Sequence, residues 1–295
     1  MPRGSQSDRG VTAAKPGGVY VTALTVYPVK SLAGIPLDEA WVETRGLHGD
    51  RRWAVVDPEG TKVTAREEHA LLGLRAEPLD GGWVRLVAPG DDALELAPPR
   101  GAAPVPVAFS GQEHALPAGA DADAWLTARV GRPLRLVWQD DETHRPIRPD
   151  MGGTDGDSNS LSDAAPLHVT SESSLARLND WLLETAAERG EEPRDPLGHD
   201  RFRPNVVVSG SEPFAEDAWT TVGIGGVPFR ATMVCDRCVM TTVDRVDLRT
   251  AKEPIRTLAR HRKWDGATWF GIRLTPVLPL PDGAVLRVGD PVEPD

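Results

Sequence analysis

"MVCDRCVMTTVD", residues 233–244, contains the only two cysteines of the 295-residue chain, Cys235 and Cys238. The stretch continues a segment, W-T-T-V-G-I-G-G-V-P-F-R-A-T-M-V, whose β-branched and aromatic residues are typical of strands. Arg237 lies between the two cysteines, and a cation beside a thiol favours the thiolate form. The sequence therefore predicts a reactive sulfur at the end of a β-strand.

The rest of the chain predicts a mainly β protein with a few helices. Strand-like runs such as VYVTALTVYPV, RRWAVV, WVRLVAP, NVVVSG and WFGIRLTPVL are separated by turn residues, as in barrels and sandwiches. The D-P-E-G turn at 57–60 predicts a hairpin. Helices are expected at 121–130, with an Asp N-cap and Gly131 at the end, and at 171–189, where Leu175, Leu178 and Leu182 share one face.

Composition divides the chain into four segments. Residues 1–18 are polar and predict a flexible tail. Residues 19–140 predict a first β-barrel-like domain. Residues 141–165, rich in Asp, Gly, Ser and Pro, predict a connecting loop, and residues 166–295 predict a second β-rich domain.

Charge and hydropathy exclude several partners. The net charge of −11 repels phosphate polymers, so we expect no nucleic acid partner. No run approaches the roughly 20 apolar residues that span a bilayer, and the N-terminus has no apolar leader, so we expect neither membrane insertion nor secretion. The expected location is the cytoplasm, where thiols stay reduced, and this disfavours a structural disulfide between Cys235 and Cys238.

Four interpretations of the cysteine pair compete. Structural zinc needs four ligands, but there is no second C-x-x-C and no H-x₃₋₅-H spacing. A thioredoxin-like pair opens a helix, whereas this one follows a strand. Two buried, inert cysteines are common in proteins, yet the adjacent Arg237 favours a fourth interpretation. In that interpretation one cysteine thiolate is a ligand of a soft metal that belongs to a cofactor.

The order of several motifs resembles the MOSC family of molybdenum-cofactor proteins. C-D-R-C-V-M-T-T-V-D, E-P-I-R-T-L at 253–258 and V-G-D-P-V at 288–292 are similar to the MOSC domain. V-Y-P-V-K-S at 26–31, G-D-R-R-W at 49–53 and V-T-A-R-E-E at 63–68 resemble the β-barrel domain that precedes it. The resemblance covers about residues 19–294 and is nearest to the amidoxime-reducing proteins. It implies an N-terminal β-barrel-like domain followed by a MOSC β-barrel domain.

The resemblance also implies a site. The molybdenum would be carried by a pterin dithiolene, with the Cys238 thiolate as its one protein ligand and catalytic residue, while Cys235 would pack beside it. The pterin and its phosphate would be bound by Lys30, Ser31, Arg51, Arg203, Asn205 and Arg237, and secondarily by Thr170 and Ser171. Taken singly, most of these would be solvated charges or turn residues, and Ser171 would be a helix cap. Arg52 is expected to be a surface charge.

The implied activity is reduction of N-hydroxylated compounds such as amidoximes, hydroxylamines and N-hydroxylated bases, by transfer of oxygen to molybdenum. An attached iron–sulfur domain would need four more cysteines, so we expect a separate electron-donor protein of the ferredoxin or flavin-reductase type. One alternative is a carrier that binds the cofactor without turnover. Another is a β-rich interaction protein with incidental cysteines. The presence of molybdenum separates the last from the other two.

Overall fold

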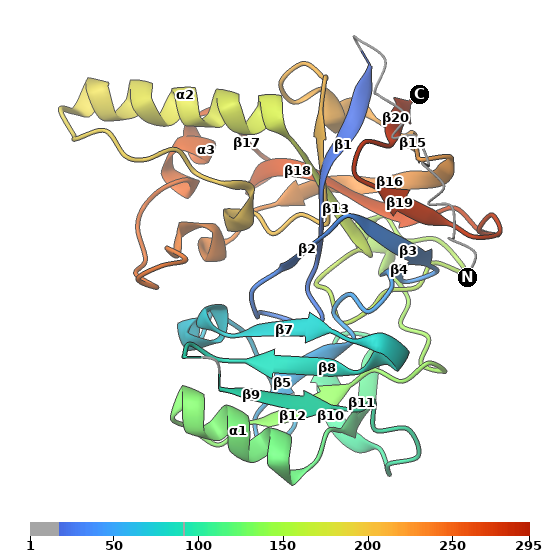
Figure 1. The fold of residues 1–295 in the computed structure, drawn as a ribbon. Helices are drawn as coiled ribbons and strands as arrows, with labels where there is room; N and C mark the ends of the chain where they lie inside the picture. The colour runs from blue at the N-terminus through green and yellow to red at the C-terminus, as the bar shows by residue number, and fades with distance from the viewer. Residues whose placement is uncertain (1–17, 91) are drawn as a thin grey trace, which may run out of the picture.

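The protein is described by a computed structural model that covers residues 18–90 and 92–295. Apart from residue 18, the expected tail at 1–18 lies outside the described residues. Within the described ranges the chain forms twenty β-strands and three α-helices, arranged as two β-rich halves (Figure 1). The expected fold class, mainly β with a few helices, is therefore confirmed.

Seven strands close a barrel in the upper half of Figure 1, because β18 pairs with both β16 and β13. Their order around the barrel is β13 (Leu167–Ser171), β14 (Val206–Ser209), β1 (Val19–Val26), β20 (Pro291–Pro294), β15 (Thr221–Ile224), β16 (Val227–Asp236) and β18 (Ala267–Pro276). β2 (Ile35–Leu37) adds to β1, and β17 (Lys263–Trp264) adds to β18. The long β16 carries Cys235 near its end, as the sequence predicts.

Two helices cover this barrel on one side. α2 (Glu172–Arg189) and α3 (Ile255–His261) pack their apolar side chains against Phe202 and Phe270 of the barrel half. The helix expected at 171–189 is confirmed, with Ser171 at the N-cap position, although its side chain makes no capping bond. No helix in the described ranges combines the length and hydropathy of a membrane span.

The lower half is built on a five-stranded sheet and a three-stranded sheet. The first has the order β10 (Val105–Phe109), β11 (Gln112–Pro117), β12 (Arg135–Trp138), β5 (Trp53–Val56) and β6 (Lys62–Val63). The second is β7 (Arg75–Pro78), β8 (Val84–Val87) and β9 (Ala93–Leu96). The 57–60 hairpin is confirmed, since β5 and β6 pair antiparallel.

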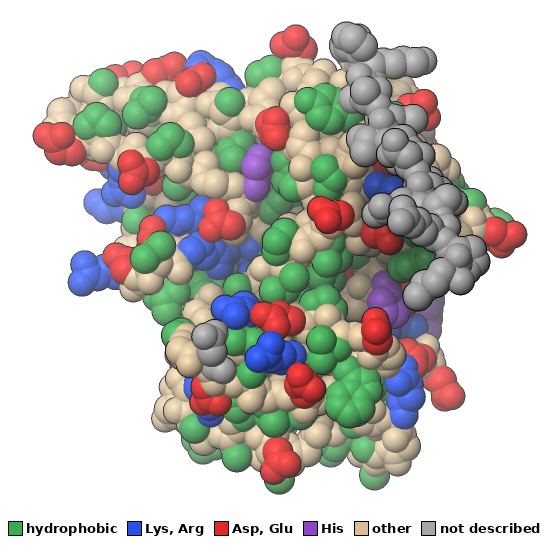
Figure 2. Space-filling model, in the orientation of Figure 1, with side chains coloured by type: hydrophobic (Ala, Val, Ile, Leu, Met, Phe, Trp, Pro, Cys, Tyr) green, Lys and Arg blue, Asp and Glu red, His purple; other side chains and the backbone are tan. Residues whose placement is uncertain are grey.

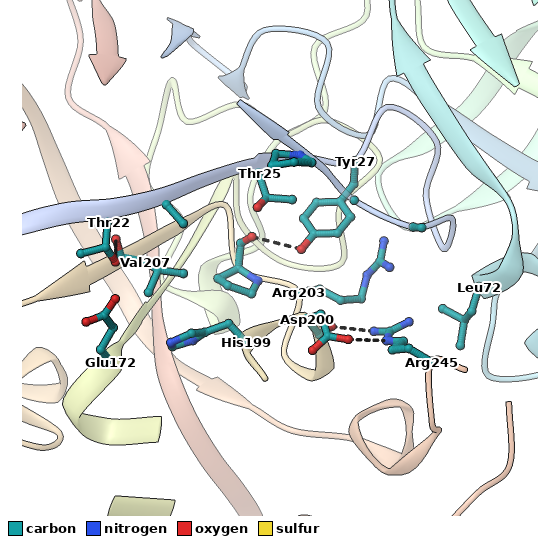
Figure 3. Close-up of a pocket in the computed structure, with 15 residues that line it drawn as sticks. Thr22, Thr25, Tyr27, Leu72, Glu172, His199, Asp200, Arg203, Val207 and Arg245 are labelled. Carbon is teal, nitrogen blue, oxygen red and sulfur yellow. Dashed lines mark hydrogen bonds and ion pairs between the residues drawn. The ribbon is translucent and has the colours of Figure 1, made fainter. Parts of the chain in front are cut away.

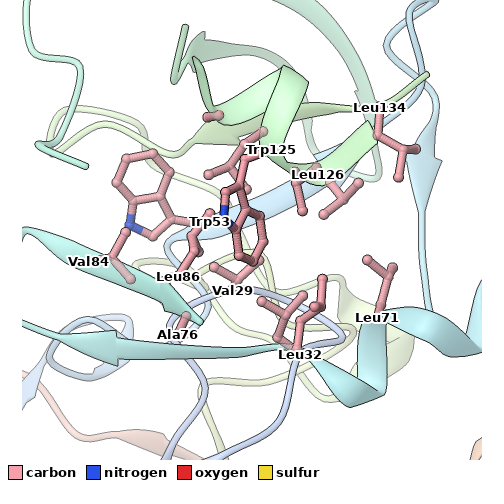
Figure 4. Packing of buried hydrophobic residues seen from close by; sticks show 14 of the residues in the cluster. Val29, Leu32, Trp53, Leu71, Ala76, Val84, Leu86, Trp125, Leu126 and Leu134 are labelled. Carbon is pink, nitrogen blue, oxygen red and sulfur yellow. The ribbon is translucent and has the colours of Figure 1, made fainter. Parts of the chain in front are cut away.

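Alternation along these strands builds two apolar layers. Trp53 and Val55 of β5 enter the larger core, whereas Ala54 and Val56 enter a smaller one on the opposite face. Figure 4 shows the larger core, where Trp53 and Trp125 pack among leucines and valines. Trp125 comes from α1 (Ala120–Val130), the helix expected at 121–130; its N-cap is Gly119 rather than an Asp, because the helix begins one residue earlier. Gly131 ends the helix in the left-handed conformation, as expected.

The two halves are joined by strand pairing as well as by the chain. A small sheet of β19 (Val285–Arg287), β3 (Glu39–Glu43) and β4 (Gly46–Leu47) pairs early residues with the C-terminal region. β1 itself belongs to the upper barrel. Between 141 and 165, a range described throughout, the only helix is η3. The 3₁₀ helices are η1 (His69–Gly73), η2 (Asp80–Gly82), η3 (Pro149–Met151), η4 (His199–Arg201), η5 (Ala215–Ala218) and η6 (Val239–Thr242).

Candidate functional site

A cavity of about 260 Å³ at the junction of the halves collects most of the residues predicted from sequence. Its lining includes Lys30, Ser31, Arg51, Arg203, Asn205, Arg237 and Cys238, which come from turns and strand ends far apart in the chain. Cys235 lines the same cavity. A reactive thiol and several cations therefore face one concave volume, which suits a bound anion.

Two predicted residues do not line this cavity. Thr170 and Ser171 are both fully buried at the end of β13. The Thr170 hydroxyl lies 2.8 Å from Nδ1 of His199, and the Ser171 hydroxyl lies 2.9 Å from that of Ser211. In this arrangement their hydroxyls hold neighbouring loops.

Backbone strain is concentrated at the cavity. Ser31, Arg51 and Arg203 have φ values of 74°, 49° and 56°, in the left-handed region that non-glycine residues rarely adopt. Within the described ranges only three other non-glycine residues have positive φ. Such conformations cost about 1–3 kcal/mol each and cluster at binding sites, where they aim side chains that an ordinary turn would direct elsewhere.

Lys30 is buried and its ammonium is held by two acceptors. Nζ donates to the Leu161 carbonyl at 2.9 Å and to Asp163 at 2.5 Å. Asp163 also accepts from Arg66 at 2.8 Å. The charge of Lys30, against the opposing effect of burial and with help from Arg66, holds the pKa of Asp163 well below its usual range. The carboxylate therefore stays ionised between two cations.

Arg51 is positioned by residues on both sides of the cavity. Its guanidinium donates to Asp50 at 2.5 Å and to Oδ1 of Asn205 at 3.0 Å. It also lies 4.4 Å from the ring centre of Tyr27. Because Asn205 is 1% exposed and also donates to the Thr25 carbonyl at 3.1 Å, it links Arg51 rigidly to β1.

Arg203 is the least compensated cation at the cavity. Its guanidinium lies 4.2 Å from the ring centre of Tyr27 and forms no ion pair with any residue in the described part of the chain. Burial, with Arg245 and Arg51 nearby, lowers the pKa of Arg203 to about 9. A cation in this situation is stabilised by any anion that reaches it.

Cys235 lies in a cage of cationic and polar groups. Its Sγ accepts a hydrogen bond from Nη1 of Arg237 at 3.0 Å, and the same Nη1 lies 3.4 Å from Nε2 of His168. Burial opposes ionisation of the thiol, but Arg237, His168 and Arg273 lower its pKa to about 5. Sequence reasoning expected Cys235 only to pack here; the structure surrounds its sulfur with groups that favour the thiolate form.

Arg237 connects this thiolate to the loop that carries Arg203. Its Nη2 donates to the Phe202 carbonyl at 2.8 Å, one residue before Arg203. Its Nε is buried with no partner among the described residues. Arg237 thus links the segment that carries the two cysteines to residues 201–205, which include Arg203 and Asn205.

Cys238 is half-buried, and both it and Cys235 are free thiols. Burial disfavours the charged form of Arg66, but Asp163 and the nearby Cys238 hold its pKa above the ordinary value. Arg66 comes from the lower half of the molecule, so the two halves meet at this sulfur. No group of three or more His, Cys, Asp or Glu in the described ranges is arranged to hold a metal ion without other ligands.

Among the residues that line the cavity, sequence reasoning missed the charged or titratable side chains of Arg66, Asp163, His168, Asp236 and Arg273. Arg66 falls within V-T-A-R-E-E, a motif already noticed, and could have been proposed from it. Asp163 lies in the segment expected to be only a connecting loop. Nothing in the local sequence marks His168 and Arg273, which oppose each other across β13 and β18.

Arg52 is a correction to the sequence analysis. It is 7% exposed rather than a surface charge. Its guanidinium donates to the Gln139 carbonyl at 2.6 Å and to Asp141 at 3.0 Å, and it faces the Trp138 ring at 5.1 Å. Although the two arginines are adjacent in sequence, Arg51 lines the cavity, whereas Arg52 holds the start of the connecting segment.

Electrostatics sets the cavity apart from the rest of the protein. The chain carries a net charge of −11, and acidic side chains are scattered over the face seen in Figure 2. The cavity lining contains six Lys or Arg residues against two Asp: Lys30, Arg51, Arg66, Arg203, Arg237 and Arg273 against Asp163 and Asp236. An acidic protein that gathers cations around two free thiols offers a site for an anionic ligand with a thiolate-binding centre.

Comparison with known proteins agrees with this arrangement. Residues 18–133 match the MOSC N-terminal beta barrel domain, and residues 156–293 match the MOSC domain. The chain is 34% identical over 178 residues to mitochondrial amidoxime-reducing component 1 of Homo sapiens, covering 57% of this chain and 49% of that protein. It is 32% identical over 161 residues to molybdenum cofactor sulfurase of Solanum lycopersicum, covering 52% of this chain and 20% of that protein.

A further relative is mitochondrial amidoxime-reducing component 1 of Xenopus laevis, 33% identical over 184 residues, with 59% of this chain and 50% of that protein covered. The matched region thus spans about half the length of the amidoxime-reducing components and a smaller part of the sulfurase. Because the two domain matches follow each other along nearly all of the described chain, the protein belongs to the family in which a MOSC N-terminal β-barrel domain precedes a MOSC domain.

Proposed function

We propose that the protein is a molybdenum-cofactor-dependent oxidoreductase that reduces N-hydroxylated compounds, with Cys238 as the protein ligand of the metal. The observation that carries the proposal is the convergence of Lys30, Arg51, Arg203 and Cys238 on one cationic cavity. These residues lie far apart in sequence. Three residues predicted for the site, Ser31, Arg51 and Arg203, have backbone conformations in the left-handed region. The named relatives that match the chain include amidoxime-reducing components, which supports the reaction class.

The residues present fit a pterin-dithiolene molybdenum cofactor. A terminal phosphate needs cationic donors, which Lys30, Arg51 and Arg203 offer, and Arg203 has no carboxylate partner among the described residues to compete. A soft metal needs a thiolate, and Cys238 is free and half-buried at the cavity. The proposed secondary contacts from Thr170 and Ser171 require the end of β13 to open, because both are fully buried.

When bound, the cofactor would supply two-electron chemistry and an acceptor for the oxygen of an N–O bond. The chain's own residues perform the other tasks. Asn205 and Asp50 fix the direction of Arg51, and Arg237 fixes the loop that carries Arg203. The walls from both halves limit the access of bulk water to the sulfur, which strengthens each ionic contact. Electrons would come from a separate ferredoxin-like or flavin-reductase-like protein.

The test is to produce the full chain in a host that makes the cofactor, then measure molybdenum by elemental analysis and turnover of benzamidoxime with an artificial reductant. We expect molybdenum in proportion to protein and formation of benzamidine. Cys238→Ala should lose both. Leu183→Ala, which truncates an exposed side chain on α2 away from the cavity, is the matched control and should retain both.

A carrier function is the second candidate, since molybdenum cofactor sulfurases also match the chain. A carrier would bind molybdenum through Cys238 but convert no N-hydroxylated substrate with any reductant. It would also release the cofactor to an apo-acceptor protein. Folded protein from the same host that contains neither molybdenum nor pterin would contradict both functions and favour an interaction protein.

A further inference from the structure

The loop that follows η6, residues 243–250, reaches from the upper half of the molecule into the core of the lower half. Val243 is fully buried in the larger core of the lower half, and Leu248 packs against the same core. Met240, from η6, packs there as well and also lines the cavity that contains the cysteines. The other described members of this core come from residues 29–138. We call residues 243–250 the anchor loop, because its apolar side chains fasten the cysteine segment to the other half.

A single turn of 3₁₀ helix separates the anchor loop from Cys238. Cys238 occupies the N-cap position of η6, and its carbonyl accepts a hydrogen bond from the Thr241 amide at 3.2 Å. Where the anchor loop returns, the Ala251 amide donates to the Thr242 carbonyl at 3.0 Å. A turn this short, hydrogen-bonded at both ends, moves as a unit. The position of the anchor loop therefore sets the position of the sulfur.

Leu248 holds the anchor loop in a conformation that its own backbone disfavours. Its φ is 59°, in the left-handed region where a residue with a bulky side chain is strained. Its carbonyl oxygen accepts a hydrogen bond from Nδ1 of His69 at 3.2 Å. The end of its side chain lies over η1, since a Cβ added at Gly73 would be 4.0 Å from Leu248 Cδ1. Contacts with the lower half therefore retain a backbone that would otherwise relax.

The anchor loop is also tied to the upper half. Nη2 of Arg245 donates to the Asp200 carbonyl at 2.8 Å. Figure 3 shows Arg245 between Asp200 of η4 and Leu72 of η1, where all three line a second cavity of about 420 Å³. The apex of the loop faces solvent, and Val246 is 93% exposed. The loop thus spans the two halves, with its apolar side chains on the lower one.

We infer that Leu248 is a positioning residue for Cys238. Its side chain, seated on η1, holds the anchor loop and η6 so that the sulfur stays at the cavity beside Arg66, which the lower half supplies. The first domain thereby fixes the residue through which the second domain is proposed to act. This role deepens the proposed function, on which the identity of the sulfur as a metal ligand rests, whereas the position of the sulfur can be measured without a metal.

The test measures how fast iodoacetamide labels Cys238 in the cofactor-free full chain. Leu248→Asn removes the apolar anchor, while Asn tolerates the left-handed backbone. Leu248→Met restores an apolar side chain of similar size, and Val246→Ala truncates an exposed residue of the same loop. Labelling at about pH 9, above the ordinary thiol pKa of about 8.5, makes exposure rather than ionisation set the rate.

The two cysteines can be followed separately. Because Arg237 lies between them, trypsin releases Cys235 within residues 231–237 and Cys238 within residues 238–245. Cys235 is 7% exposed and bonded to Arg237, so its labelling rate is the internal control for general opening of the fold. We expect the Cys238 rate to rise about tenfold or more in Leu248→Asn, equivalent to about 1.4 kcal/mol in the population of the released loop. It should change less than about twofold in Leu248→Met and Val246→Ala.

A Cys238 rate in Leu248→Asn within about twofold of wild type overturns the inference. So does an equal rise at Cys235, which shows general loosening, or a rise in Leu248→Met as large as that in Leu248→Asn. In protein from a host that makes the cofactor, molybdenum per chain should fall in Leu248→Asn and stay at the wild-type level in the other two variants. Wild-type protein without molybdenum would contradict the proposed function, while the labelling rates would still decide whether Leu248 positions Cys238.

Discussion

Replacing the Cys235 thiol by a hydroxyl should make the protein less stable by an amount that depends on pH. In Cys235→Ser the side chain keeps nearly the same shape but cannot ionise near neutrality. Arg237 would then lose the anion that accepts its Nη1 hydrogen bond at 3.0 Å. Arg273, which pairs with Asp236, and His168 also lie near this sulfur and favour its ionised form.

The size of the effect follows from the shift of the thiol pKa from 9.0 to about 5. Because the folded-state pKa lies below the unfolded value, the contribution is complete above about pH 9 and is lost as the pH falls towards 5. Each unit corresponds to about 1.4 kcal/mol, so at pH 7 about two units are expressed, or roughly 2–3 kcal/mol. That agrees with the roughly 1.5–3 kcal/mol typical of a hydrogen bond to a charged group.

The assay is urea unfolding of cofactor-free protein at pH 5.5, 7 and 8.5 under reducing conditions, followed by circular dichroism. The difference in unfolding free energy between wild type and Cys235→Ser should grow with pH across this range, by roughly 3–4 kcal/mol in total if the full slope is expressed. Leu183→Ala is a control for changes that do not involve the thiolate, and its difference should not vary with pH. A constant difference for Cys235→Ser would refute the thiolate assignment.

Three further outcomes are expected. Gly271→Ala should lower the free energy of unfolding in urea by several kcal/mol, because φ at this position is 74° and an added Cβ would lie 2.5 Å from the Val169 carbonyl oxygen. Gly266→Ala is the control: φ is 78° there, but the added Cβ would enter open space, so the loss should be only about 1 kcal/mol. Burial raises the pKa of Glu216 to about 7, so the neutral carboxyl that suits this buried position is lost as the pH rises through 7. Gln cannot ionise, so the unfolding free energy of Glu216→Gln should rise relative to that of wild type between pH 5 and pH 8 in the same assay. Asp163→Asn removes the anion from Lys30, so sulfate should raise the melting temperature of this variant more than that of wild type.

Local features of the sequence predicted the elements well. The C-terminal glycine of α2 and its apolar stripe are encoded within some twenty residues, so the expected bounds of 171–189 differ from the observed helix by one position. The 57–60 hairpin is equally local, since Asp57 accepts the Thr61 amide at 2.8 Å. Where a single short segment contains the whole physical cause, sequence alone was enough.

Long-range pairing lies beyond such reasoning. β1 pairs with β14, and Thr22 bonds to Val207 across 185 positions, yet neither run of β-branched residues specifies the other. The burial of Arg52 also depends on long-range pairing. Its hydrogen-bond partner, the Gln139 carbonyl, is brought next to it because β12 pairs antiparallel with β5. The ion pair of Lys30 with Asp163 joins the first predicted domain to the predicted connecting loop. Charges can be counted from sequence, but their partners depend on topology.

The site residues themselves were found by motif resemblance, and the structure adds a physical reason for their grouping. A protein of net charge −11 has placed six cations around one cavity, where they repel one another and are only partly offset by Asp50, Asp163 and Asp236. Three strained backbone conformations add to that cost. A bound anion would relieve the repulsion that remains and would stabilise the fold in proportion to the logarithm of its concentration over its dissociation constant. Arg203, which lines the cavity and has no carboxylate partner among the described residues, is where that gain should be largest.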